Sequence, residues 1–170
     1  RQVYEYANYL HATTDFKKAD EYYQKAIELD PHHTDALAFS ALNKIQLKDF
    51  DKAYEQIQHA LHHETNNDFM YFIAGKIRYL QGEIEDAKMY FVKSYELQKT
   101  YDCEHMLGLC YFELGNFEQA NGIFKHMLEK NPLNVNLLLN SAKCYEKLGE
   151  KDEALRVLDK ITDTFPECEE

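Results

Sequence analysis

A repeat with a period of about 34 residues constrains this chain more than any other feature of its sequence. Five segments align without gaps, beginning near residues 15, 49, 83, 116 and 150. They share the alanines Ala19, Ala53, Ala87, Ala120 and Ala154, which are separated by steps of 34, 34, 33 and 34 residues. A chain with this period stacks similar structural units, each of which buries its apolar surface against its neighbours.

The halves that precede these segments also repeat. A column of small residues consists of Ala7, Ala41, Gly75, Gly108 and Ala142, and a column of large apolar residues consists of Tyr23, Ile57, Phe91, Phe124 and Leu158. We expect two helices in each repeat, with the small residue allowing close approach and the large one filling the space beside it. Gly82, Gly115 and Gly149 stand where a helix ends in the left-handed conformation. Asp15, Asp49 and Asn116 then follow as N-caps of the second helix.

The clearest copies are MLGLCYFELGNFEQANGIFKHMLEKNP and SAKCYEKLGEKDEALRVLDKITDTFP. This pattern resembles the tetratricopeptide repeat (TPR) family, although no Trp occurs and repeats two and three lack a closing Pro. The resemblance implies an all-α fold, a right-handed superhelix (α-solenoid) of about ten antiparallel helices with a concave groove. It also implies a scaffold that binds other proteins. We expect a single array over residues 1–170, with repeats at about 1–33, 34–67, 68–100, 101–134 and 135–168.

Both ends of the array lack a recognisable polar capping helix. Arg1 already lies in a predicted helix, and Leu155 and Leu158 are apolar residues of the last one. Because a terminal repeat needs a solvated outer face, we expect the chain to be part of a longer protein. Self-association through such uncapped ends is a further possibility that the sequence leaves open.

In the family, one face of each first helix points into the groove. On that face the middle three repeats are apolar, whereas the first and last are polar. Apolar and aromatic surface with a polar rim is typical of an interaction site, although inter-repeat packing is the alternative. The predicted partner-binding residues are Phe39, Leu42, Phe69, Phe72, Ile73, Lys76, Tyr79, His105, Met106, Leu109 and Phe112. Phe72 and Phe112 are the first candidates for binding hot spots.

Five consecutive apolar residues at 69–73, FMYFI, cover every direction around a helix. The repeat register divides them between two faces. It assigns Tyr71 to the packing face, leaves Met70 between the faces, and directs Phe69, Phe72 and Ile73 toward the groove.

The TPR proteins that hold the carboxylate of a chaperone tail carry a clamp of Lys, Asn and Arg on the groove face. In the first three repeats of this chain the matching positions are Tyr4, Asn8, Phe39, Phe69 and Ile73. Only Asn8 fits, and the other repeat triplets also lack a cationic pair. Because a carboxylate would find no bidentate partner, this type of binding is rejected.

The net charge of −11 argues against binding to nucleic acid or to acidic membrane surfaces. No run of 18 apolar residues and no signal-peptide pattern occurs in the sequence, so membrane insertion is not expected. We expect a cytoplasmic protein whose partner is another polypeptide, a peptide or an amphipathic helix. The acidic surface favours a partner with basic flanks.

Eight histidines and four cysteines raise the question of a metal or disulfide site. His59 and His63 are i, i+4 on one helix with Glu55 one turn earlier, a spacing that can chelate a metal. However, no other ligand is forced nearby, so we expect solvated surface histidines and no metal. Cys110 and Cys144 share a repeat position and are expected to be small buried residues without a disulfide, and Cys168 is a candidate exposed thiol.

No phosphate-binding glycine loop, HExxH or GxSxG motif occurs, so we expect no cofactor and no enzyme activity in this chain. The main hypothesis is a protein-binding scaffold with an apolar groove. Two alternatives remain open. The chain is a structural segment whose groove is filled by self-association or by its own chain, or it is the substrate-recruiting arm of an enzyme whose catalytic domain lies elsewhere.

Overall fold

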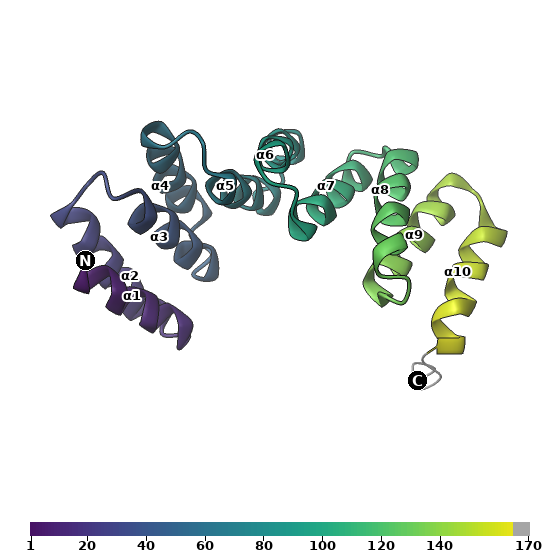
Figure 1. Ribbon diagram of the computed structural model, residues 1–170, viewed down its shortest axis with the longest axis horizontal. Coiled ribbons are helices and arrows are strands. Elements are labelled where there is room, and N and C mark those ends of the chain that lie inside the picture. Colours follow the sequence, from purple (N-terminus) through teal and green to yellow (C-terminus); the bar gives the residue numbers. More distant parts are fainter. Residues whose placement is uncertain (165–170) are drawn as a thin grey trace. The chain divides into compact units, whose positions relative to one another are not determined.

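The computed structural model describes residues 1–164, and all ten elements in that range are α-helices (Figure 1). The chain divides into two compact units, residues 1–98 and 99–170, which are called unit 1 and unit 2. The helices are α1 Gln2–Ala12, α2 Phe16–Leu29, α3 Thr34–Gln46, α4 Phe50–His63, α5 Asp68–Leu80, α6 Ile84–Leu97, α7 Tyr101–Glu113, α8 Phe117–Lys130, α9 Val135–Leu148 and α10 Lys151–Thr164. The all-α prediction is confirmed.

Consecutive helices form five pairs, and each pair lies inside one of the predicted repeat ranges. Within unit 1, α2 also packs against α3 and α4 against α5; in unit 2, α8 packs against α9. Within each unit, a repeat therefore buries its apolar residues partly between its own two helices and partly against a neighbouring repeat, as in a stacked helical array.

The same turn closes all five helix pairs. Residues Thr14, Lys48, Gly82, Gly115 and Gly149 occupy its left-handed position, with φ of 64, 60, 84, 78 and 80°. In repeat two, for example, the amide of Lys48 donates to the Ile45 carbonyl, and the next amide donates to the Lys44 carbonyl at 2.9 Å. This pair of bonds is the Schellman motif, which satisfies free carbonyls at a helix end. Two repeats adopt it without glycine.

The predicted contact between the small and the large residue of a repeat is present in the two repeats whose small residue is glycine. A Cβ atom added to Gly75 would lie 2.8 Å from the Phe91 ring, and one added to Gly108 would lie 2.5 Å from the Phe124 ring. Both phenylalanines are fully buried. Only glycine therefore fits beside these rings without displacing them.

The N-cap predictions hold in part. Asp15, Asp49 and Asn116 all occupy the N-cap position, but only the Asp15 side chain accepts a bond, from the Lys18 amide at 3.3 Å. Asp49 instead pairs with Lys52 at 3.3 Å. Among residues 1–164, no helix is long and apolar enough to cross a membrane.

Candidate functional site

Three aromatic side chains form a continuous row across the first helices of unit 1. Tyr4 lies on α1, Phe39 on α3 and Phe69 on α5, and the ring centroids are 6.1 Å apart for Tyr4 and Phe39 and 5.7 Å apart for Phe39 and Phe69. Edge-on and tilted ring contacts at this spacing are favourable. Phe69 remains 39% exposed, and the other two rings are half-buried. We call these three residues the aromatic row.

The row could not be found from one column of the repeat. Tyr4, Phe39 and Phe69 occupy three different positions of the repeat register, so the contact runs diagonally across the helices. Tyr4 is not among the predicted contact residues, because it belongs to repeat one, whose groove face is otherwise polar. Its ring nevertheless lies beside Phe39 and 4.9 Å from the His33 ring. Tyr4 could have been predicted as a contact residue by comparing each position of a first helix with the adjacent positions, and not only the equivalent one, in the neighbouring repeats.

The assignment of Ile73 to the groove is wrong. Ile73 is 0% exposed and belongs to the apolar core of repeats two and three, because the side of α5 that carries it is covered within unit 1. Met70, which the register left between two faces, is buried in the same core. Helix periodicity gave the direction of these side chains around the axis but not the extent to which neighbouring helices cover them.

The remaining predicted residues of unit 1 are half-buried. Leu42 packs against the core of repeats two and three, and the Phe72 ring lies 5.6 Å from the buried Phe91 ring. Phe72, Lys76 and Tyr79 follow one another at i, i+4 and i+7 on α5, so they share one stripe of that helix. Phe69 presents the largest exposed fraction of this predicted set in unit 1, which makes it a better candidate contact than Phe72.

In unit 2 the predicted residues His105, Met106, Leu109 and Phe112 are all half-buried on α7. The ring of His105 lies 6.1 Å from that of Phe124, and its Nε2 accepts a hydrogen bond from the Asn140 side-chain amide at 3.2 Å. Burial lowers the pKa of His105, which favours the neutral imidazole that can accept this bond. Phe112 packs edge-on against Phe117 at 5.2 Å.

The one position that matched the chaperone-tail clamp is engaged within its own repeat. The Asn8 side-chain oxygen accepts a hydrogen bond of 2.6 Å from the Tyr23 hydroxyl. Burial raises the pKa of Tyr23, so this hydroxyl stays protonated and able to donate. Asn8 is therefore a structural partner of a buried tyrosine.

A second apolar surface lies on the last two helices. Leu139 of α9 and Leu155 and Leu158 of α10 are exposed by 37, 57 and 38%. They line an open cavity of about 440 Å³ together with Ala142, Lys143, Glu146, Lys151 and Ala154. We call this surface the α9–α10 face.

The buried cysteines agree with the prediction. Cys103, Cys110 and Cys144 are all fully buried, and burial raises the pKa of the Cys144 thiol to about 11. Cys168 lies outside the described residues. The predicted exposure of His59 and His63 is confirmed. The expectation that no further ligand lies near them is wrong, because His32 joins them in one exposed cluster.

Comparison with known proteins agrees with this architecture. The family model described as "Tetratricopeptide repeat" matches residues 10–71 and 111–170. The chain is 30% identical over 140 residues to the BBSome complex member BBS4 of Bos taurus, covering 82% of this chain and 27% of that protein. It is 36% identical over 110 residues to the mitochondrial import receptor subunit TOM70 of Rattus norvegicus, covering 62% and 18%. The chain thus spans less than a third of these relatives.

Solved structures show the same fold. A crystal structure of the MamA protein has a TM-score of 0.84 at 20% identity and covers 95% of this chain and 88% of that one. The structure of YrrB, described as a TPR protein with an unusual peptide-binding site, has a TM-score of 0.84 at 22% identity and covers 98% and 86%. The fold is one that serves as a scaffold for protein–protein interaction. From the helix pairs, the repeated turn and the family match, the chain belongs to the tetratricopeptide repeat family.

Proposed function

We propose that this chain is a protein-binding scaffold whose unit 1 binds an apolar segment of another protein at the aromatic row. The observation that carries the proposal is the continuity of Tyr4, Phe39 and Phe69 over three helices with ring separations of about 6 Å. Rigid aromatic side chains dominate interface hot spots because they bury a large area at low entropic cost. The segment is an amphipathic helix or an extended peptide with apolar anchors.

The residues and the charge around the aromatic row indicate which further features the ligand has. The clamp positions hold no cationic pair, and Asn8 is bonded to Tyr23, so the ligand is not recognised by a terminal carboxylate. The net charge of −11 steers ligands with basic flanks toward the surface, which raises the association rate more than the affinity. The proposed secondary contacts are Leu42 and Phe72, one turn along their helices from Phe39 and Phe69, and Lys76 and Tyr79, which lie further along α5. YrrB shows that a TPR protein of similar fold has a peptide-binding site.

The apolar residues of α7 form a second proposed contact face, in unit 2. Met106 and Leu109 are its main residues, since a flexible thioether adapts to irregular partner surfaces. Phe112 and His105 are partly engaged with Phe117 and Asn140 and contribute less. The proposal includes no catalytic role for either face.

The test uses Phe69, because it lies at one end of the aromatic row and has the largest exposed fraction of the predicted contacts in unit 1. Peptides that bind residues 1–170 are selected from a random display library, and their dissociation constants are measured for wild type and Phe69→Ser. We expect apolar and basic residues in the selected peptides and a loss of affinity of at least about tenfold in Phe69→Ser. Met89→Ser is the matched control, since Met89 is 67% exposed on the second helix of the same repeat.

Two results would overturn the proposal. One is equal affinity of the selected peptides for wild type and Phe69→Ser while both melt at the same temperature. The other is an equal loss in Met89→Ser, which would indicate nonspecific apolar adsorption. Phe39→Leu gives a second check, because it keeps apolar volume but removes the middle ring of the row.

The exposed leucines of the α9–α10 face favour a second candidate function, self-association of this segment as part of a larger scaffold. Sedimentation velocity at several protein concentrations tests it directly. We expect concentration-dependent dimers that Leu155→Lys abolishes, because a charge placed in an apolar interface loses its hydration. A strict monomer at all concentrations would reject this candidate and leave the peptide-binding proposal unaffected.

A further inference from the structure

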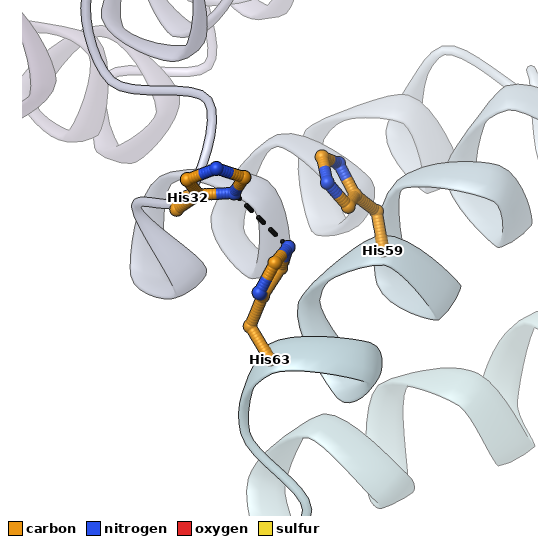
Figure 2. A group of neighbouring side chains, drawn as sticks. All are labelled: His32, His59 and His63. Carbon is orange, nitrogen blue, oxygen red and sulfur yellow. Dashed lines mark hydrogen bonds between the residues drawn. The ribbon is translucent and has the colours of Figure 1, made fainter.

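Three histidine side chains from two repeats converge on the surface of unit 1 (Figure 2). His59 and His63 project from α4, one turn apart, and His32 reaches toward them from the turn between α2 and α3. One ligand atom of each imidazole lies within 4.8 Å of the others. His32 Nδ1 and His63 Nε2 are 3.0 Å apart and share a hydrogen bond.

The turn that carries His32 is held in place by its own polar bonds. The carboxylate of Asp30 accepts a hydrogen bond from the His32 amide at 3.2 Å, and Pro31 restricts the backbone between them. Thr34 then donates to Glu64 at 2.9 Å, which ties the start of α3 to the residue that follows α4. These bonds bring the backbone of residue 32 to the C-terminal end of α4, where His63 lies.

The neighbouring histidine has a different task. His33 is the N-cap of α3, and its Nδ1 accepts a hydrogen bond from the Ala36 amide at 3.2 Å. Its imidazole is therefore committed to the helix end, whereas His32 is left to face α4. His33 therefore caps a helix, whereas the adjacent His32 takes part in the histidine cluster.

We propose that His32, His59 and His63 form a binding site for a divalent transition-metal ion of the zinc or copper class. Imidazole nitrogens are preferred ligands of these ions. A tetrahedral ion with metal–nitrogen bonds of about 2.0–2.1 Å separates its ligand atoms by about 3.3 Å. The observed spacing reaches this value by rotation of exposed side chains, and three protein ligands leave a fourth position for water.

The electrostatic environment supports the same chemistry. Metal binding requires the neutral form of the imidazole, whose free nitrogen is the ligand atom. The hydrogen bond between His32 and His63 likewise requires one neutral nitrogen to accept. The net charge of −11 also raises the local concentration of cations.

The site would join consecutive repeats. His32 belongs to the turn that ends repeat one, and the other two ligands belong to the second helix of repeat two. An ion bound to all three would cross-link this junction and stabilise the folded state, because the unfolded chain does not hold the ligands together.

The experiment titrates the full 170-residue chain, without an affinity tag, with Zn²⁺ alone at pH 7.5 in a calorimeter. We expect one ion per chain and a rise of several degrees in the melting temperature in excess Zn²⁺. His32→Ala should weaken binding by more than about tenfold, since loss of even an indirect contact to a metal ligand costs about that much. Cu²⁺ electron paramagnetic resonance should show three coordinated nitrogens in wild type and two in His32→Ala.

His62→Ala is the matched control, because His62 is exposed on the same helix and lies outside the three-residue cluster. It should bind Zn²⁺ within about twofold of wild type. If His32→Ala bound as tightly as wild type, the pair on α4 alone would account for binding and the three-ligand site would be rejected. Equal losses in His62→Ala and His32→Ala, or no stoichiometric binding to wild type, would also overturn the proposal.

Discussion

Repeats two and four build the same helix pair from residues of different size and polarity. In repeat two the small–large pair is Ala41 and Ile57, whereas in repeat four it is Gly108 and Phe124. The two positions compensate each other, because the larger ring stands opposite the residue that lacks a Cβ atom. Between repeats two and four, the combined volume at the crossing of the two helices is therefore kept similar, whereas the identity of both residues changes.

The positions that follow the small residue differ in polarity. Repeat two has Asn43 and Lys44, both buried, and repeat four has Cys110 and Tyr111 at the same places. Asn43 donates to the Phe16 carbonyl at 2.8 Å and contacts His11, and Lys44 pairs with Asp20 at 2.9 Å. All these partners belong to repeat one. Repeat two thus carries buried polar groups that only the correct preceding repeat satisfies.

The buried polar contacts that Asn43 and Lys44 make with repeat one are called the polar junction, and the largest effect is expected from breaking them. Lys44→Ala leaves Asp20 without its buried partner and should lower the free energy of unfolding of unit 1 by about 3 kcal/mol. Urea denaturation followed by circular dichroism measures this change. The double variant with Asp20→Ala should cost clearly less than the sum of the single losses. Additive losses would show that the pair is not coupled.

Lys52→Ala is the matched control for the polar junction. Lys52 pairs with Asp49 on the surface at 3.3 Å, and the two side chains are 68 and 37% exposed. Loss of such a pair should cost no more than about 0.5 kcal/mol. A similar loss in both lysine variants would mean that burial at Lys44 does not set the energy of the junction.

A smaller effect is expected from changing the volume balance of repeat four. Gly108→Ala places a Cβ atom 2.5 Å from the Phe124 ring and should destabilise unit 2 by about 1–2 kcal/mol in urea denaturation. Adding Phe124→Ile creates the alanine–isoleucine pair of repeat two. The double variant should therefore be more stable than the sum of its single changes predicts.

Gly122→Ala provides the control for glycine in the same repeat. A Cβ atom at Gly122 meets nothing within 4 Å, so this variant should gain about 0.5–1 kcal/mol from helix propensity alone. If Gly108→Ala were stabilising by a similar amount, the close contact with Phe124 would not constrain this position.

The smallest effect concerns the turns. Lys48 in repeat two adopts the left-handed conformation with φ of 60°, whereas Gly115 occupies the equivalent position in repeat four. Lys48→Gly should increase the free energy of unfolding by about 1 kcal/mol and so raise the melting temperature. Gly115→Ala should decrease the free energy of unfolding by a similar amount and lower the melting temperature. Differential scanning calorimetry on both variants would detect these opposite shifts. Shifts of the same sign would contradict the assignment of strain to the side chain.

The sequence was sufficient to predict the parts of the fold that depend on local periodicity. Helix pairs, glycine turns and the contact of Gly108 with Phe124 all follow from residues at fixed offsets within one repeat. Ile73 and Met70 could not be placed in this way, because their burial depends on how closely the neighbouring helices cover α5. The aromatic row could not be predicted from any single repeat position, because its three residues occupy three different positions of the repeat.

The histidine cluster was missed for a different reason. His32 lies in a turn, and the direction of its side chain depends on hydrogen bonds of Asp30, His33 and Thr34 that the helical period does not describe. The available signal was positional. The end of one repeat lies next to the end of the following one in a stacked array, so residues near 32 and 63 could have been compared directly.

The uniform turn has a consequence for how such a chain changes its length. All five helix pairs are closed by the same two backbone bonds, which do not require a particular side chain. Duplication or loss of a 34-residue segment of the gene would therefore join the same kind of helix end to the same kind of helix start. What such an event must preserve is the order of Asp20, Asn43 and Lys44, since these residues make the first two repeats a matched pair rather than interchangeable modules.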